Sequence, residues 1–195
     1  MSTATDTATR DTVNVIRVDY TNPVHTARLM VLLDSYARDP MGGGEALPAD
    51  RLQRLPGLLA ATPGAFSLLA LPPTAAALPE AEQASEALGF ANCFETLSTF
   101  AAAPLVNIHD IAVEPGHRGL GVSQALIAGV EAVARERGCC KITLEVLSGN
   151  RIAQSAYRRA GFVPTGMGDA VNVIESQLQS PEDPDQVYWF WSKSL

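Results

Sequence analysis

The sequence has few cysteines, few charges and no long apolar run. Its three cysteines form no CxxC pair and have no histidine at metal-ligand spacing, so we expect no disulfide framework, no metal site and a reduced, cytoplasmic setting. Acidic residues outnumber basic ones by 21 to 14, and no Lys/Arg run is present, which disfavours nucleic-acid and anionic-membrane partners. Every apolar stretch is interrupted well before the ~20 residues that a membrane span requires. Residues 1–12 lack the form of a signal peptide and are expected to be a flexible tail.

The apolar content is sufficient for one core. The 195 residues are 47% hydrophobic and 18% charged, which indicates a single globular domain over residues 13–195. Periodicity predicts strands at 13–18, 65–71, 88–95, 105–113, 140–147 and 187–192, and helices at 23–38, opened by Pro23, at 49–61, before Gly138 and at 150–160. We expect a mobile loop at 42–44 and an unstructured linker at 74–85. Strand, glycine-containing turn, helix and strand follow one another from residue 105 to 147, which indicates a mixed α/β architecture.

The turn after the strand 105–113 is the first place where chemistry can be argued. It carries Gly119 and Gly121 and leads into a helix, where free backbone N–H groups and the helix dipole favour an anion such as phosphate. The dinucleotide pattern GxGxxG fails after Gly121, and the NTP-binding pattern GxxxxGK[ST] is absent. A tight connection without any ligand explains the glycines equally well at this stage.

Two blocks of sequence resemble the GNAT superfamily of acyl-CoA N-acetyltransferases. The first runs from Ile108 to Ser123, and the second is Asn150-x-x-Ala153-x-x-x-Tyr157-x-x-x-Gly161-Phe162. The first block matches the acetyl-CoA motif of that family, Arg/Gln-x-x-Gly-x-Gly/Ala, with Ser123 in place of the last small residue. The resemblance implies an α/β (α+β) fold. Its sheet would be mixed and mostly antiparallel, with about six to seven strands, flanking helices and a splayed central strand pair.

The resemblance also implies a cofactor site for acetyl-CoA, the acyl donor, without a metal. The pantetheine arm would pair with the main chain of Ile111, Ala112 and Val113, which would also form a buried strand. The pyrophosphate would lie on the backbone amides of Arg118, Gly119, Leu120, Gly121, Val122 and Ser123. Asn150 and Ala153 would border the cofactor, although Asn150 fits a helix cap equally well. Tyr157 matches a tyrosine near the thioester sulfur, as a general acid or as a packing residue.

Acetylation of an amine also needs a proton acceptor, because a lysine-like amine of pKa ~10.4 is almost wholly protonated at pH 7. His109 is the favoured base, since a histidine of reference pKa ~6.5 is largely unprotonated there. Strand alternation places His109 on one face with Asn107 and Ile111, so that Asp110 faces away in a structural role. The competing interpretation of His109 is a packed strand histidine.

The acceptor site is expected between the first two helices, at residues 39–47, and in the segment 92–100, as the resemblance implies. Glu95, Ser98 and Thr99 are candidates for binding an ammonium or an amino-acid-like group, and Phe100 for an apolar wall. Glu95 also fits an ordinary exposed charge. Amino acid, polyamine, antibiotic and protein N-terminus all remain open as acceptors.

The sequence therefore predicts an N-acetyltransferase that acts on a primary amine of a small molecule. Direct attack of the amine on acetyl-CoA requires no covalent enzyme intermediate. The alternatives are a protein or peptide N-acetyltransferase and a non-catalytic acyl-CoA-binding module. The aromatic run Tyr188-Trp189-Phe190-Trp191 fits either a core strand or a homodimer interface.

Overall fold

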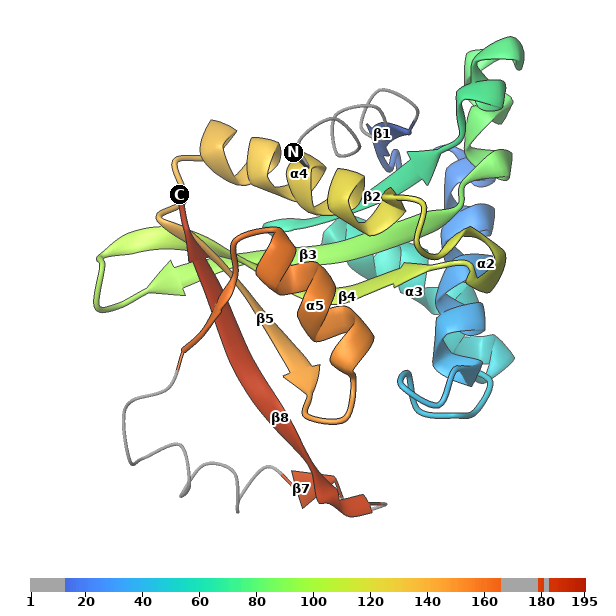
Figure 1. Ribbon diagram of the computed structural model, residues 1–195. Coiled ribbons are helices and arrows are strands. Elements are labelled where there is room, and N and C mark those ends of the chain that lie inside the picture. The colour runs from blue at the N-terminus through green and yellow to red at the C-terminus, as the bar shows by residue number, and fades with distance from the viewer. Residues whose placement is uncertain (1–12, 166–178, 181–182) are drawn as a thin grey trace, which may run out of the picture.

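The computed structural model describes residues 13–165, 179–180 and 183–195, in which one twisted sheet lies between two layers of helices (Figure 1). The expected tail, residues 1–12, lies outside the described residues. Along the sheet the strands are β1 (Asn14–Arg17), β2 (Ala65–Leu71), β3 (Gly89–Ser98), β4 (Ala103–Val113), β5 (Lys141–Leu147), β8 (Asp183–Ser194) and β6 (Val163–Pro164), and β7 (Gln179–Ser180) pairs with β8. Only the β4–β5 pair is parallel among these strands. The predicted mixed, mostly antiparallel sheet is confirmed.

The α-helices of the described residues, α2 to α5, cover both faces of the sheet (Figure 1). Helices α2 (Pro23–Arg38) and α3 (Ala49–Ala61) cover one face, and α4 (Val122–Glu136) and α5 (Arg151–Arg159) cover the other. The apolar spacing seen in the sequence gives each face its own core. Leu29 and Phe90 are fully buried on the α2 face, and Leu126 and Trp191 are fully buried on the α4 face.

The segment expected to be an unstructured linker is folded instead. It forms two 3₁₀ helices, η1 (Pro73–Ala77) and η2 (Glu80–Glu86). Ala75 and Ala84 are buried against the α2 core, and the guanidinium of Arg28 donates twice to the carbonyl of Ala87. Small side chains pack closely without any apolar periodicity, so the alanine-rich composition was mistaken for a linker.

Three strands run further than predicted. β3 and β4 extend to Ser98 and from Ala103, so the expected long loop is a short turn with Ala102 at φ 47°. β8 begins at Asp183 and alternates along its aromatic run. Trp191 is buried, whereas Tyr188 and Phe190 are each 42% exposed on the opposite face.

No helix in the described ranges has the length and apolar character to cross a membrane.

β4 and β5 separate in the middle of the sheet, as the resemblance implied. Their pairing covers only residues 106–108 of β4 and 142–144 of β5. Beyond that point β4 stays with β3 and β5 stays with β8, and Figure 1 shows α5 lying in front of the gap between them. The edge of β4 that faces this gap is therefore free of strand partners among the described residues.

A β-bulge interrupts β4 where the separation begins. β3 residues Asn92 and Cys93 pair with Asp110 and Ile108, so that His109 has no partner on β3. One extra residue shifts the side-chain alternation by one position. The bulge therefore lies at the residue predicted to be the general base.

The bulge overturns part of the predicted alternation. Ile111 packs into the α4 core on the same face as Ile108, whereas Ala112 packs on the α2 face. Asp110 also lies on the α2 face, since it bonds to Asn92. The expectation that Asp110 faces away from His109 and that Ile111 shares its face is wrong, because it assumed an uninterrupted strand.

Candidate active site

The turn before α4 is built to receive an anion. Gly119 and Gly121 have φ of +79° and +81°, a left-handed conformation that costs other residues about 1–2 kcal/mol. Gly121 is the N-cap of the 15-residue α4, and no side chain caps this end of the helix. The backbone N–H groups at the start of α4 are therefore available to a ligand at the positive end of the helix dipole.

The side chains of the turn point in different directions. Val122 is buried in the core and Leu120 is 55% exposed, so both would meet a cofactor through their main chain. Arg118 donates from Nε to the carbonyl of Val113 at 3.2 Å and from Nη2 to the Asp39 carboxylate at 2.8 Å. This ion pair and the amide of Met41 hold the pKa of Asp39 below its usual range. The turn is thereby tied to the end of α2.

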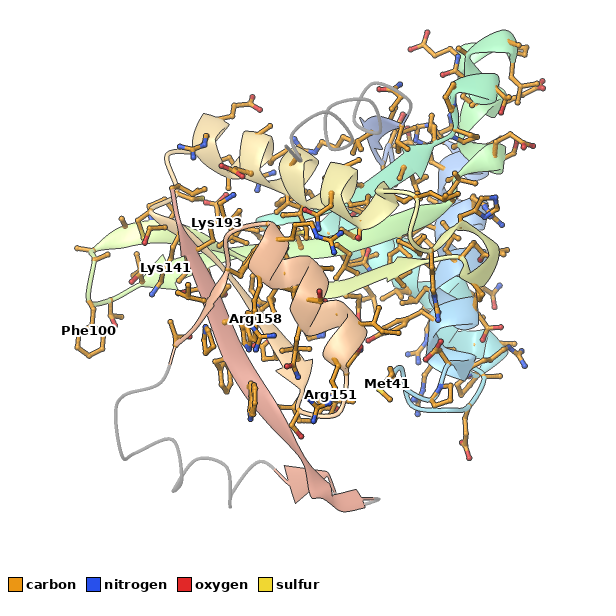
Figure 2. All side chains as sticks on the ribbon, in the orientation of Figure 1. Met41, Phe100, Lys141, Arg151, Arg158 and Lys193 are labelled. Atoms are coloured by element: carbon orange, nitrogen blue, oxygen red, sulfur yellow. The ribbon has the colours of Figure 1, made fainter. Side chains whose placement is uncertain are left out.

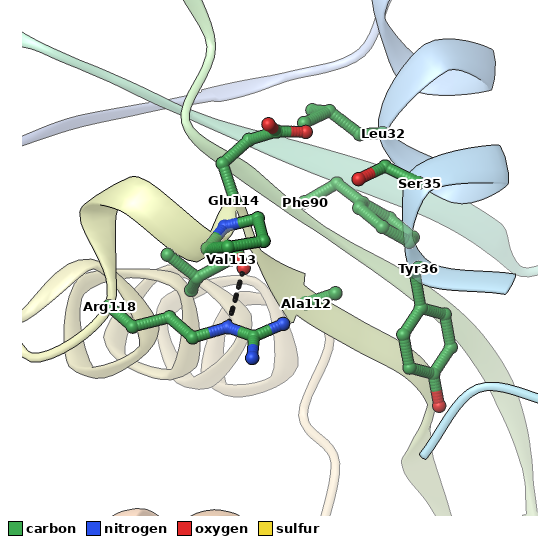
Figure 3. Close-up of a pocket in the computed structure, with 9 residues that line it drawn as sticks. Leu32, Ser35, Tyr36, Phe90, Ala112, Val113, Glu114 and Arg118 are labelled. Carbon is green, nitrogen blue, oxygen red and sulfur yellow. Dashed lines mark hydrogen bonds between the residues drawn. The ribbon is translucent and has the colours of Figure 1, made fainter. Parts of the chain in front are cut away.

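A narrow crevice lies between α2 and the end of β4, beside this turn (Figure 3). Its lining residues are Leu32, Ser35, Tyr36, Phe90, Ala112, Val113, Glu114, Pro115 and Arg118. The rings of Tyr36 and Phe90 meet edge to face with centroids 6.3 Å apart. The strand predicted to pair with pantetheine thus has an open edge toward β5 and a crevice on its α2 side.

Tyr157 lies on α5, on the α4 side of the gap. Its ring is 8% exposed and contacts the rings of Phe162 and Trp191. Burial, followed by the nearby Tyr36 phenol, raises the pKa of Tyr157 above its ordinary value. The phenol therefore keeps its proton at neutral pH, and no described residue hydrogen bonds it.

Both interpretations of Asn150 can now be compared with its contacts. Its Oδ1 accepts from the amide of Ala153 at 3.1 Å, so it caps α5. Ala153 itself packs against the core.

Two glutamines that the sequence did not single out hold α5 in place. Gln154 donates to the carbonyl of Leu147 at 3.1 Å, and Gln124 of α4 donates to that of Ala156 at 2.8 Å.

His109 is exposed at the bulge, on the α2 face of the sheet. Its ring meets that of Phe94 edge to face, with centroids 5.5 Å apart. Next to it, the Asp110 carboxylate accepts from Nδ2 of Asn92 at 3.1 Å. The bulge thus brings an imidazole and a carboxylate to the same face, at the point where β4 leaves β5.

Further polar groups lie on this face, and among them the sequence had singled out only Asn107. Asn107 donates to Thr143 Oγ1 at 3.2 Å and to the Glu145 carboxylate at 3.3 Å, across the last paired positions of β4 and β5. Tyr36 of α2 lies near Asp110. Burial, followed by the charge of Asp110, raises the pKa of Tyr36 to about 12. Corrected alternation would have placed Asp110 here, but no sequence signal indicates Tyr36.

The predicted acceptor-binding residues of the segment 92–100 are not brought to the gap. Glu95 pairs with Arg137, which follows the C-terminal end of α4, at 2.9 Å. Ser98 is buried and accepts from the amide of Ala101. Thr99 and Phe100 form the tip of the β3–β4 hairpin, and Phe100 is fully exposed, far from Met41 and α2 (Figure 2).

Comparisons with known proteins identify the family. Residues 49–162 match the family model of the acetyltransferase (GNAT) family. Streptothricin acetyltransferase of Streptomyces lavendulae is 41% identical over 78 residues, which are 40% of this chain and 41% of that protein. The chain thus matches about two fifths of the length of that relative.

Solved structures agree in fold. The crystal structure of nourseothricin acetyltransferase superposes with a TM-score of 0.52 at 24% identity, over 77% of this chain and 69% of that one. AAC(6')-Iy in complex with a CoA-containing bisubstrate analogue superposes with a TM-score of 0.60 at 20% identity, over 79% of this chain and 92% of that one.

Proposed function

Because the chain belongs to the acetyltransferase (GNAT) family, we propose that it transfers the acetyl group of acetyl-CoA to a primary amine of a small molecule. The observation that carries the proposal is the pairing of two features. An uncapped helix N-terminus with two left-handed glycines lies directly after a strand whose edge is open at the gap. Together they fit a long ligand with a pyrophosphate at one end and a peptide-like arm at the other.

The residues of the two features would hold the donor as follows. Backbone amides of the segment 118–123 bind the pyrophosphate, and the main chain of residues 111–113 pairs with the pantetheine arm. When bound, acetyl-CoA supplies a thioester whose carbonyl carbon accepts a nucleophile. With its pyrophosphate at the start of α4 and its thioester near Tyr157 of α5, the donor would lie toward α4 and α5. The amine would then approach from the α2 face, where His109 and Tyr36 lie.

The reaction needs two proton transfers and no covalent enzyme intermediate. The amine nitrogen forms the new bond to the acetyl carbon, and the bond from that carbon to sulfur breaks. His109, directly or through a water, takes the proton that the amine loses. Tyr157 donates a proton to the departing thiolate, for which its raised pKa keeps the phenol protonated.

The relatives support a small-molecule acceptor as part of this proposal. Streptothricin and nourseothricin appear in the names of two proteins similar to this chain, and we propose an amine-bearing molecule of that size as the acceptor.

The test is an acceptor panel with acetyl-CoA. The panel contains streptothricin, nourseothricin, free lysine, spermidine and a short peptide with a free N-terminus, and turnover is measured by thiol release and by the mass of the product. We expect acetylation of at least one small amine and little of the peptide. Preferential acetylation of the peptide would favour a protein acetyltransferase. Tight acetyl-CoA binding without turnover of any amine would favour a non-catalytic module.

A further inference from the structure

A chain of hydrogen-bonded side chains crosses the α2 face of the sheet and ends at the bulge. The hydroxyl of Tyr20 bonds to Ser67 Oγ at 2.8 Å, and Ser67 Oγ donates to Asn92 Oδ1 at 2.6 Å. Asn92 Nδ2 then donates to Asp110 Oδ2 at 3.1 Å. The four residues come from the loop after β1 and from β2, β3 and β4, so the chain spans four successive segments of the fold.

The hydrogen bonds between these side chains all run in one donor-to-acceptor direction. Ser67 has a single hydroxyl proton, which it gives to Asn92, so Tyr20 must be the donor in the first bond. The accepted bond at Oδ1 fixes the orientation of the Asn92 amide, which therefore presents N–H groups to Asp110. Every donor points toward the bulge, and the last acceptor is a carboxylate oxygen.

The middle of this row of hydrogen-bonded side chains is deeply buried. Burial of its polar groups costs free energy unless each of them is hydrogen bonded. Ser67 is 0% and Asn92 3% exposed, beside the apolar core under α2. Apolar residues of similar size would fill these positions without the desolvation cost of burying polar groups. A satisfied buried network rigidifies what it holds, and the group at its end is Asp110.

Only one oxygen of Asp110 accepts a hydrogen bond from this row of side chains. No described residue donates to Oδ1, and no basic side chain of the described ranges forms an ion pair with this carboxylate. The residue is partly exposed next to His109. Tyr36 faces it from α2, close enough for the charge of Asp110 to contribute to the raised pKa of that phenol. The open oxygen thus lies where the acceptor would approach.

We propose that Asp110 binds a cationic ammonium group of the acceptor, and that Asn92, Ser67 and Tyr20 are positioning residues that hold this carboxylate. The inference rests on the proposed acetyltransferase function and assigns to that site an acceptor that carries a positive charge beside the bulge. Asp110 acts on binding of the acceptor, whereas proton removal stays with His109.

The test is a set of variants that interrupt this row of hydrogen bonds at increasing distance from Asp110. Asp110→Asn keeps the shape and removes the charge, Ser67→Ala removes the middle link, and Tyr20→Phe removes the outermost hydroxyl. Hydrogen bonds to charged groups contribute enough for about 10- to 100-fold in affinity. We expect Asp110→Asn to raise the KM for the amine about that much, with a smaller change in kcat and an unchanged KM for acetyl-CoA. Ser67→Ala and Tyr20→Phe should raise it by successively smaller factors.

Glu136→Gln is the matched control, because it removes one negative charge from the exposed end of α4. It should leave both KM values unchanged, and thermal melting of every variant checks folding. If Asp110→Asn and Ser67→Ala melt like the parent chain and keep its amine KM within twofold, the assignment is wrong. An equal loss of kcat and acetyl-CoA affinity in these variants would also overturn it, because it would show general damage to the site.

The same variants separate this inference from the proposed function. If the parent chain acetylates no amine in the panel, the proposed function fails. Calorimetric titration of streptothricin and spermidine into the CoA-saturated parent and Asp110→Asn chains still decides the inference. Weaker binding to Asp110→Asn supports an ammonium site, and equal binding, or none to either chain, refutes it.

Discussion

Gly121→Asp separates the stability of the turn before α4 from its capacity to bind an anion. Gly121 has φ +81° and is the N-cap of α4. A non-glycine residue in this conformation costs about 1–2 kcal/mol. A side chain caps helix amides from a residue in the β region, so an aspartate held at φ +81° recovers little of this strain by capping. The free energy of unfolding should therefore fall by about 1–2 kcal/mol.

Acetyl-CoA binding should respond far more strongly to the same substitution. The new carboxylate would lie in the turn whose amides the pyrophosphate needs and would repel its charge. Two unit charges 4 Å apart repel by about 4 kcal/mol at an effective dielectric constant of ~20. A penalty of about 3 kcal/mol, which allows for solvent screening, weakens binding more than 100-fold. Calorimetric titration with acetyl-CoA measures this loss directly.

Gly138→Asp provides the control for backbone strain. Gly138 follows the other end of α4 with φ +67°, and a Cβ there would meet no atom within 4 Å. This variant should lose stability from the same strain while it binds acetyl-CoA like the parent chain. If Gly121→Asp folds and retains acetyl-CoA affinity within threefold, the pyrophosphate does not bind at this turn.

Three further predictions concern the chemistry and the remote ion pair. His109→Ala should lower kcat/KM by about 10²- to 10⁴-fold, the usual contribution of a general base, with acetyl-CoA affinity unchanged by calorimetry; a parent-like rate would remove His109 from the mechanism. Tyr157→Phe should lower mainly kcat, and because burial raises the pKa of Tyr157, the parent rate should show no alkaline decline before pH ~10, the ordinary tyrosine value; a decline near pH 8 that Tyr157→Phe removes would contradict this. Arg137→Gln breaks the pair with Glu95 and the contact over the Phe66 ring, so it should destabilise the fold by about 1–2 kcal/mol in urea unfolding and leave the amine KM unchanged; an altered KM would bring Glu95 back as an acceptor ligand.

Much of the fold could be predicted because its elements follow local patterns. The bounds of β2 match the prediction, and α2 begins at Pro23, where Asn22 supplies the cap. The structure of the alanine-rich segment 74–85 was missed because its 3₁₀ helices depend on close packing of small side chains against α2 rather than on periodicity. The extent of β8 was underestimated because its N-terminal part, from Asp183, is polar.

The candidate site divides in the same way. Main-chain features such as the turn at Gly121 follow from local sequence, because left-handed glycines before a helix have a recognisable pattern. The side chains around the bulge do not, since Tyr36 and Asn92 each lie near Asp110 but come from elements far apart in the sequence. Glu95 was proposed as an acceptor ligand from its residue type and its place in the segment 92–100, and its partner Arg137 lies 42 residues away.

The bulge at His109 explains why the strand that carries the chemistry was the hardest to predict. An uninterrupted β4 would place His109 and Asp110 on opposite faces, and only one of them could meet an amine. One unpaired residue brings both to the α2 face while it returns Ile111 to the α4 core, so the apolar pattern on either side of the bulge remains intact. Sequence periodicity cannot reveal the insertion, because the residues beyond it, Ile111 to Val113, are apolar on both faces. The position follows only from the register with β3, in which the buried Asn92 pairs with Asp110. Asn92, which pairs with Asp110 in this register, therefore also holds its carboxylate beside the proposed base.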